Sequence, residues 1–149
     1  MKRTIAAFAA LVLALVLTPA VANADTELHP DVEYALETVP GGIALSDSAV
    51  VWPALGMTLE AQSAMQRAVG SCATGTYCAY AQSGLRGTKL TFTICTNVST
   101  AALQTVGSIA NGRSSGNVHA RNGGTTLATA AANGSANVGG GTTNLLCTL

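Results

Sequence analysis

Acidic side chains are missing from most of this chain. The 149-residue sequence has seven Asp and Glu residues, and all of them precede residue 61. Residues 61–149 therefore cannot supply the paired carboxylates that glycoside hydrolysis requires. The only histidines are His29 and His119, and a Ser-His-Asp arrangement would have to take its acid from the N-terminal segment. We expect no catalytic residue, and we interpret His119 as a surface or edge-strand residue.

Basic residues are also few, and motifs for cofactors are lacking. Beyond residue 24, five bases stand against seven acids, which leaves a net charge of −2. Five scattered bases do not form the clustered patch of a nucleic-acid-binding protein. No glycine motif follows a strand and opens a helix, as phosphate binding would need. A His-based zinc site lacks ligands. We therefore expect no nucleic-acid partner, no cofactor and no metal site.

The one long apolar run lies at the N-terminus, from Ile5 to Leu17. It follows a positively charged start and precedes the small-residue cleavage site Ala22-Asn23-Ala24. This is the pattern of a secretory signal peptide, and the run is too short for a membrane-spanning helix. We assign residues 1–24 to a signal peptide. We expect a secreted protein that begins at Asp25 and has no stable membrane anchor.

Export changes what the four cysteines indicate. An even number of cysteines in an oxidising compartment predicts two disulfides. Four cysteines allow three pairings, and sequence alone does not choose among them. The local option joins Cys72 to Cys78 and leaves Cys95 with Cys147, and this is the pairing that we prefer. By loop-closure entropy the short bridge stabilises the fold by ~2.4 kcal/mol and the long one by ~4 kcal/mol. A four-thiolate zinc site would need two CxxC-type pairs, which this spacing lacks.

Residues 25–70 form an N-terminal extension in our interpretation. Pro30 to Val39 could form two helical turns, with Pro40-Gly41-Gly42 as the stop. A mobile linker with transient helix is the alternative, because the segment is short. The apolar residues of such a helix would share one face, and they are Val32, Ala35, Leu36 and Val39.

Residues 43–60 predict a hairpin, with Ala49–Trp52 as a strand, a turn at Pro53–Gly56 and a return from Met57. Trp52 is the only tryptophan. We interpret it as a core residue, and an exposed platform for carbohydrate stacking is the alternative. Thr58 could then cap a helix through Val69, or this segment could be a loop between strands.

From Cys72 onward, short β-type segments alternate with glycine turns. Asn-Gly pairs fit hairpin turns because both central residues need positive φ. Ser99 to Val106 could hold one helical turn. The segment Gly87–Thr91 recurs faintly as Gly124–Ala128, which is compatible with a duplicated four-stranded motif. The pattern predicts a mainly β domain, a sandwich or barrel of antiparallel strands, over residues 71–149. The expected strands are Thr76–Ala81, Thr88–Cys95, Asn117–Arg121, Thr125–Ala130, Ser135–Val138 and Thr142–Leu149.

The run from Tyr80 to Gly87 resembles the Greek-key signature of βγ-crystallins, in which an aromatic precedes a glycine across a folded hairpin. Leu85 stands at the place of a second aromatic. The aromatic would pack over the hairpin, and Gly87 would take a backbone conformation closed to other residues. With the preceding Cys-x5-Cys, residues 69–149 are similar to the exported actinobacterial proteins called peptidase inhibitor family I36. The run Val106–Gly116 and the late cysteine share this similarity.

The resemblance implies a βγ-crystallin-like antiparallel Greek-key sandwich that follows an N-terminal extension. It also implies a secreted inhibitor of extracellular metalloproteinases, which acts by stoichiometric occlusion of the protease active site. We expect a monomer. The alternative is a structural or cell-surface binding module without inhibitory activity. Calcium binding is a variant of that alternative, because Asn111–Ser115 matches most of the βγ-crystallin calcium motif. Ala110 removes one oxygen ligand, however, and we favour a turn held by side-chain hydrogen bonds.

Overall fold

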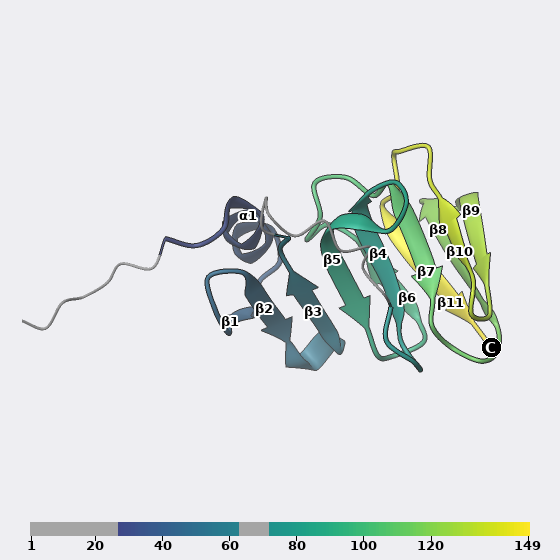
Figure 1. Cartoon of the computed structure of the whole chain (residues 1–149), viewed down its shortest axis with the longest axis horizontal. Coiled ribbons are helices and arrows are strands. Elements are labelled where there is room, and N and C mark those ends of the chain that lie inside the picture. The colour runs from purple at the N-terminus through teal and green to yellow at the C-terminus, as the bar shows by residue number, and fades with distance from the viewer. Residues whose placement is uncertain (1–26, 63–71) are drawn as a thin grey trace, which may run out of the picture.

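The computed structural model describes residues 27–62 and 72–149, and within them the protein is mainly β (Figure 1). One helix, α1 (Pro30–Thr38), and one 3-10 turn, η1 (Pro53–Leu55), accompany the strands. The predicted signal peptide lies outside the described residues. The strands are β1 (Ile43–Ala44), β2 (Ala49–Trp52), β3 (Met57–Glu60), β4 (Tyr77–Gln82), β5 (Arg86–Phe92), β6 (Asn97–Ser99), β7 (Ser108–Asn111), β8 (Asn117–Asn122), β9 (Thr125–Ala131), β10 (Ser135–Asn137) and β11 (Asn144–Thr148).

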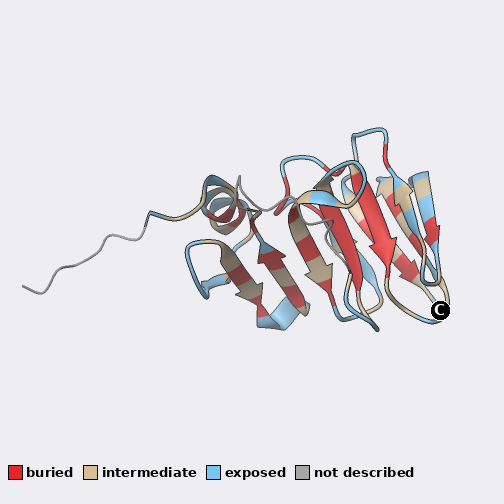
Figure 2. Cartoon of the chain, viewed as in Figure 1, coloured by how far each residue is buried: buried red, intermediate tan, exposed pale blue. Residues whose placement is uncertain are grey.

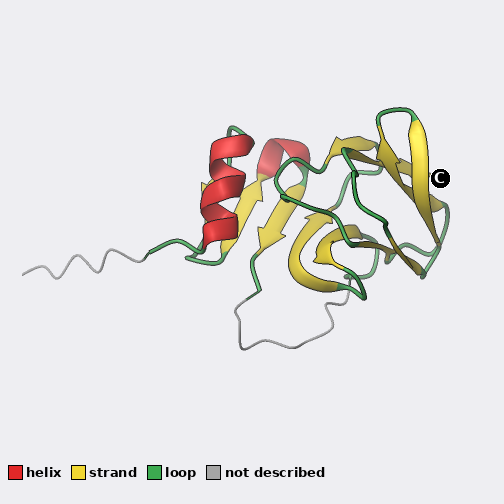
Figure 3. Ribbon diagram, turned by 90° about the horizontal axis from the view of Figure 1, so that it is seen from above, coloured by secondary structure: helices red, strands yellow, loops and turns green. Residues whose placement is uncertain are grey.

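The strands form two antiparallel sheets. Sheet A has seven strands in the order β1-β2-β3-β5-β4-β7-β10, and sheet B has four in the order β6-β11-β8-β9. Sheet B and α1 cover the same face of sheet A, because a single hydrophobic cluster contains residues from all three (Figure 3). The cluster draws Val32 from α1, Leu59 and Ile109 from sheet A, and Val118 and Leu145 from sheet B. The predicted extension therefore continues the same sheet, since β3 pairs with β5.

The last eight strands repeat one arrangement twice. In the run β4–β7, the first, second and fourth strands lie together in sheet A, while the third, β6, lies in sheet B. In the run β8–β11, the first, second and fourth strands lie in sheet B, while the third, β10, lies in sheet A. The fourth strand of each run pairs with the first. The faint sequence repeat falls on the second strand of each run, β5 and β9.

A hydroxyl group closes the first hairpin of each run in the same way. Ser108 Oγ accepts a hydrogen bond from the Leu85 amide at 3.0 Å and donates one to the Gln82 carbonyl at 2.6 Å. Thr143 Oγ1 accepts from the Gly123 amide at 2.9 Å and donates to the Arg121 carbonyl at 3.4 Å. Each hydroxyl stands at the start of a fourth strand, so it ties that strand to the turn of the hairpin beside it.

The predicted helix is confirmed as α1, and it is docked rather than mobile. Proline stands at its start, and His29 caps it by accepting from the Asp31 amide at 3.2 Å. Thr88 of β5 donates a hydrogen bond to the Asp31 carboxylate. Val32 and Ala35 of the predicted apolar face are fully buried. These contacts supply the tertiary packing that so short a helix needs.

Trp52 is a core residue, as we predicted. Only 1% of its surface is exposed, which excludes a platform for stacking sugars. Its indole Nε1 donates to the Val39 carbonyl at 2.9 Å and so fastens the end of α1 to the hairpin. Gly42 allows this approach, because a Cβ there would lie 2.8 Å from the Trp52 ring.

The helix predicted from Thr58 is wrong over its described part. Thr58–Glu60 belong to β3, which pairs with β2 on one side and β5 on the other. Met57 and Leu59 are buried and Thr58 and Glu60 are not, which is the alternation of a strand with one face on the core. Partners on both sides outweigh the local cap signal of Thr58. The rest of the predicted helix, 63–69, lies outside the described residues.

The sequence also missed two strands. Ser99 ends β6, and residues 100–103 form a turn in which the Leu103 amide bonds the Thr100 carbonyl, so the helical turn predicted at Ser99–Val106 is absent. Asn111 ends β7, and the turn predicted after it leads from sheet A into sheet B, so it does not close a hairpin. β7 is buried at every position (Figure 2), because Ile109 packs in the core cluster on one face of sheet A and Ala110 packs with Cys78 and Tyr80 on the other. Its small residues carry little strand propensity of their own.

The expected hairpin of Asn117–Arg121 and Thr125–Ala130 is confirmed as β8 and β9, which pair antiparallel across the predicted turn. Asn133 does adopt positive φ, at 55°. Its turn, however, leads from sheet B into sheet A, so it makes no hairpin. Both predicted disulfides are present, Cys72–Cys78 and Cys95–Cys147. The second bridge joins the segment before β6 to β11.

Candidate functional site

Four connections leave sheet A at the same end. Met57, Phe92, Tyr77 and Asn111 lie in one row across β3, β5, β4 and β7. Beyond this row come the η1 turn, the segment 93–96, the loop 72–76 and the turn 112–116. We call this the loop end of the molecule; η1 marks it at the lower edge of Figure 1. Two large apolar residues, Leu55 and Ile94, are about half exposed there.

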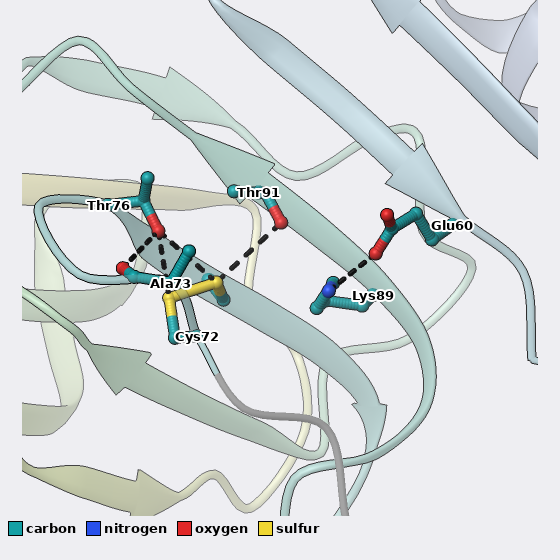
Figure 4. A network of polar contacts seen from close by, with 7 residues as sticks. Glu60, Cys72, Ala73, Thr76, Lys89 and Thr91 are labelled. Carbon is teal, nitrogen blue, oxygen red and sulfur yellow. Dashed lines mark hydrogen bonds and ion pairs between the residues drawn. A yellow bond between two sulfur atoms is a disulfide. The ribbon is translucent and has the colours of Figure 1, made fainter. Parts of the chain in front are cut away.

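The loop from Cys72 to Thr76 is exposed at its tip and fixed at its base. Ala73, Thr74 and Gly75 are exposed, whereas Cys78 is fully buried. Thr76 Oγ1 donates to the Ala73 carbonyl at 2.7 Å and lies 3.4 Å from the Cys72 sulfur (Figure 4). The disulfide and this hydrogen bond close the loop on itself, so its tip keeps a defined shape in water.

Gly112 holds the loop from the side. Its amide donates to the Thr76 carbonyl at 2.9 Å, and its carbonyl accepts from the Gly75 amide at 2.8 Å. A Cβ on Gly112 would lie 2.4 Å from the Ala73 carbonyl oxygen. Only glycine allows this approach, since no side chain fits against a backbone atom at that distance. The sequence indicated a turn at Gly112 but gave no signal for its contact with the cysteine loop.

Aromatic side chains support Ile94 from beneath. Tyr77 stacks on Phe92 with ring centroids 5.1 Å apart, and its hydroxyl donates to the Ile94 carbonyl at 2.8 Å. Burial raises the pKa of Tyr77 above its ordinary value, and the hydrogen bond to the Thr96 backbone opposes this shift in part. The exposed Ile94 is therefore held by a rigid, buried pair.

The predicted motif residues Tyr80, Leu85 and Gly87 lie on the opposite face of sheet A from sheet B. Tyr80 is fully buried, and Leu85 packs against the cluster that it forms with Cys78 and Ala110. Gly87 has φ of 78°, and Leu85 also has positive φ, at 59°. The Gly87 amide donates to Gln62 Oε1 at 2.7 Å. The sequence did not identify Ser108, because its contact with this hairpin joins residues more than twenty positions apart.

Because the Tyr80 hydroxyl is buried, we expect the folded state to lose stability at alkaline pH. This hydroxyl has no hydrogen-bond partner among the described residues. Burial, and to a lesser extent the negative charge of Glu60, raises the pKa of Tyr80 to about 12 from 10.0. The folded state therefore holds this proton more tightly than the unfolded state does. The resulting stability is complete below pH 10 and is lost as the pH rises toward about 12.

We expect urea unfolding between pH 10 and 12 to show this loss, and Tyr80→Phe to reduce it. Part of the loss should remain in the variant, because burial also raises the pKa of Tyr77. At neutral pH, Tyr80→Phe should be at least as stable as the wild type, since an unsatisfied buried hydroxyl costs about 1–3 kcal/mol. Equal alkaline losses in the two proteins would contradict the assignment to Tyr80.

In the segment considered for calcium binding, the Asn111 side chain makes hydrogen bonds within the turn itself. Asn111 is 1% exposed; its Oδ1 accepts from the Arg113 amide and its Nδ2 donates to the Gly116 carbonyl, both at 3.1 Å. This is the turn held by side-chain hydrogen bonds that we favoured. Within residues 27–62 and 72–149, no three His, Cys, Asp or Glu residues gather as metal ligands would.

The two histidines serve structural contacts. His29 caps α1, and His119 Nδ1 lies 2.9 Å from Thr129 Oγ1 of the neighbouring strand. His119 is partly exposed, as expected, but β8 lies between β11 and β9, so it is not on an edge strand. At the loop end, the exposed apolar side chains of Leu55 and Ile94 accompany backbone groups that a disulfide holds in place.

Comparisons with known proteins give no family for this chain: no family model, no curated protein and no solved structure matches it. No helix in the described part of the chain has the length and apolar character to cross a membrane. The two disulfides agree with an oxidising compartment.

Proposed function

We propose that this protein is a secreted peptidase inhibitor that occludes the active site of an extracellular protease, with metalloproteinases as the first class to test. The observation that carries the proposal is the loop 72–76, whose exposed tip is fixed by a disulfide and by backbone hydrogen bonds to Gly112. A loop that is ordered before binding loses little conformational entropy when it enters a cleft. Such a loop can bind tightly without a large contact area.

The strand arrangement supports a βγ-crystallin-like Greek-key sandwich as the scaffold. In a Greek key the fourth strand returns to lie beside the first. Here β7 lies beside β4, and β11 lies beside β8. The buried Tyr80 and the positive φ of Gly87 agree with the roles that the resemblance implies for them.

The composition of the loop supports an inhibitor rather than a substrate. Residues 72–76 contain no charged side chain, and the loop is closed by a bond between Cys72 and Cys78. Cleavage inside a closed loop leaves both halves attached to the fold. The main chain at the tip is also reinforced by the Ala73 carbonyl, which accepts from both the amide and the hydroxyl of Thr76.

The test uses the chain from Asp25 onward with its disulfides intact, titrated against a panel of secreted metallo- and serine proteases. We expect stoichiometric loss of activity in at least one metalloprotease. Thr74→Glu should weaken inhibition by about tenfold or more, because it places a charge at the contact centre. The control is Asn122→Glu, which adds the same charge at the exposed β8–β9 turn.

The two variants separate the possible results. If the wild type in molar excess inhibits no protease, the protein is not an inhibitor, and the binding-module alternative takes its place. If both variants inhibit as well as the wild type, inhibition does not use the loop 72–76. Melting temperatures of all three proteins establish that a lost activity is not a lost fold.

A further inference from the structure

An uncharged groove lies between the end of α1 and sheet B. Its volume is about 260 Å³, and none of its lining residues is ionisable. Met57 and Phe92, both buried residues of sheet A, belong to its lining. Val39 at the end of α1 and Leu55 of η1 also line it, together with four consecutive residues, 96–99. A charged occupant would lose hydration there without gaining a partner, so the groove suits an apolar one.

One wall of the groove is an edge strand. β6 pairs with β11, and no other strand of the described residues pairs with it. The backbone groups on its other side can therefore accept an added strand. Ile94, half exposed, lies just before this strand and also lines the groove. The site thus offers hydrogen bonds from a strand edge together with an apolar floor.

A second feature of the same molecule has the matching chemistry. β1 is an edge strand of sheet A, and this extended segment pairs only with β2 among the described strands. Ile43 is 56% exposed and Leu45 is 64% exposed, and alternate residues of an extended chain point to one side. No residue from 40 to 46 is charged. Two large apolar side chains on an extended, neutral segment are what the groove can accommodate.

We propose that two copies of this chain associate by placing the segment Ile43–Leu45 of one copy in the groove of the other, beside β6. Val39, which lines the groove, is only four residues before Ile43, so strand and groove lie close together on each copy. When a two-fold axis relates the two copies, each copy places its segment in the groove of the other, and the assembly is a closed dimer. The dimer differs from the monomer that the sequence led us to expect, and the observations behind it do not involve the loop 72–76 that carries the proposed inhibition.

The experiment is the mass in solution of the chain from Asp25 onward, with disulfides intact, by light scattering or sedimentation over a range of concentrations. The wild type should reach twice the monomer mass. Leu45→Asp in the segment should halve that mass. Ile94→Asp and Leu55→Asp, which change the groove, should each do the same. Leu127→Asp is the matched control, because Leu127 is 40% exposed on β9, away from both features.

A mixture of two variants makes the test specific. Leu45→Asp keeps an intact groove and Ile94→Asp keeps an intact segment, so one of the two contacts is wild type in a mixed dimer. We expect mixed dimers at concentrations where each variant alone is monomeric. A wild type that stays monomeric at its highest concentration overturns the proposal. So does a Leu127→Asp variant that dissociates as readily as Leu45→Asp, or a mixture that does not associate.

Discussion

Replacing Gly116 with alanine is expected to lower the free energy of unfolding by at least about 3 kcal/mol. Gly116 has φ of +74°, and a Cβ there would lie 2.0 Å from the Thr148 carbonyl oxygen. The obstacle is backbone of the last strand, so it cannot be relieved by turning a side chain. Moving it would disturb β11, which pairs with both β6 and β8.

Two other glycines distinguish the cost of the close contact at Gly116 from the cost of its positive φ. Gly123 has φ of +55° with no atom near its Cβ position, so Gly123→Ala should cost only about 1–2 kcal/mol. Gly124 has neither positive φ nor a close neighbour, and Gly124→Ala should be nearly neutral. Urea denaturation followed by Trp52 fluorescence measures all three. Equal losses at Gly116 and Gly123 would show that the approach of Thr148 does not matter.

Removing the Cys95–Cys147 disulfide should cost about 4 kcal/mol, the larger effect of the two disulfides. It spans 52 residues, against 6 for Cys72–Cys78, and a longer loop restricts the unfolded chain more. Cys147 also belongs to the core cluster and is only 6% exposed. The variant Cys95→Ala/Cys147→Ala therefore loses some packing as well as the cross-link.

The matched control is Cys72→Ala/Cys78→Ala, for which we expect a loss of about 2.4 kcal/mol. Its additional consequence is local, because the loop 72–76 loses one of its two supports while Gly112 remains. Thermal unfolding of both double variants beside the wild type gives the order of the effects. A greater loss from the Cys72/Cys78 variant would show that loop length does not govern stability here.

Several elements could be predicted because their signals are local. The helix α1 follows from a proline at its start, a proline-glycine stop and apolar residues on one face. The β8–β9 hairpin follows from alternating residues on both sides of Asn122-Gly123-Gly124. The preferred cysteine pairing is also confirmed, although the residues alone left three choices open.

The candidate site was predicted only in part. The cysteine loop was visible in the sequence, since two cysteines with five residues between them form a small loop wherever they pair. Its neighbour Gly112, however, comes to it from the turn after β7, more than thirty residues later, and the exposed Ile94 depends on the packing of Tyr77 beneath it. Such neighbours have no local signature, because backbone pairing across the sheet brings them together.

By itself, the sequence determined the mainly β class and the absence of acids from the last 89 residues, and it indicated the helix at Pro30–Thr38. These properties depend on composition and on periodicity over a few residues. Only the tertiary structure decided that Thr58–Glu60 continues the predicted hairpin strand and does not begin a helix, that β6 and β10 cross to the opposite sheet, and that β1 and β6 each keep one edge unpaired among the described strands. The physical reason is that a strand is stabilised by hydrogen bonds to distant partners, so its place in a sheet depends on which partners are available.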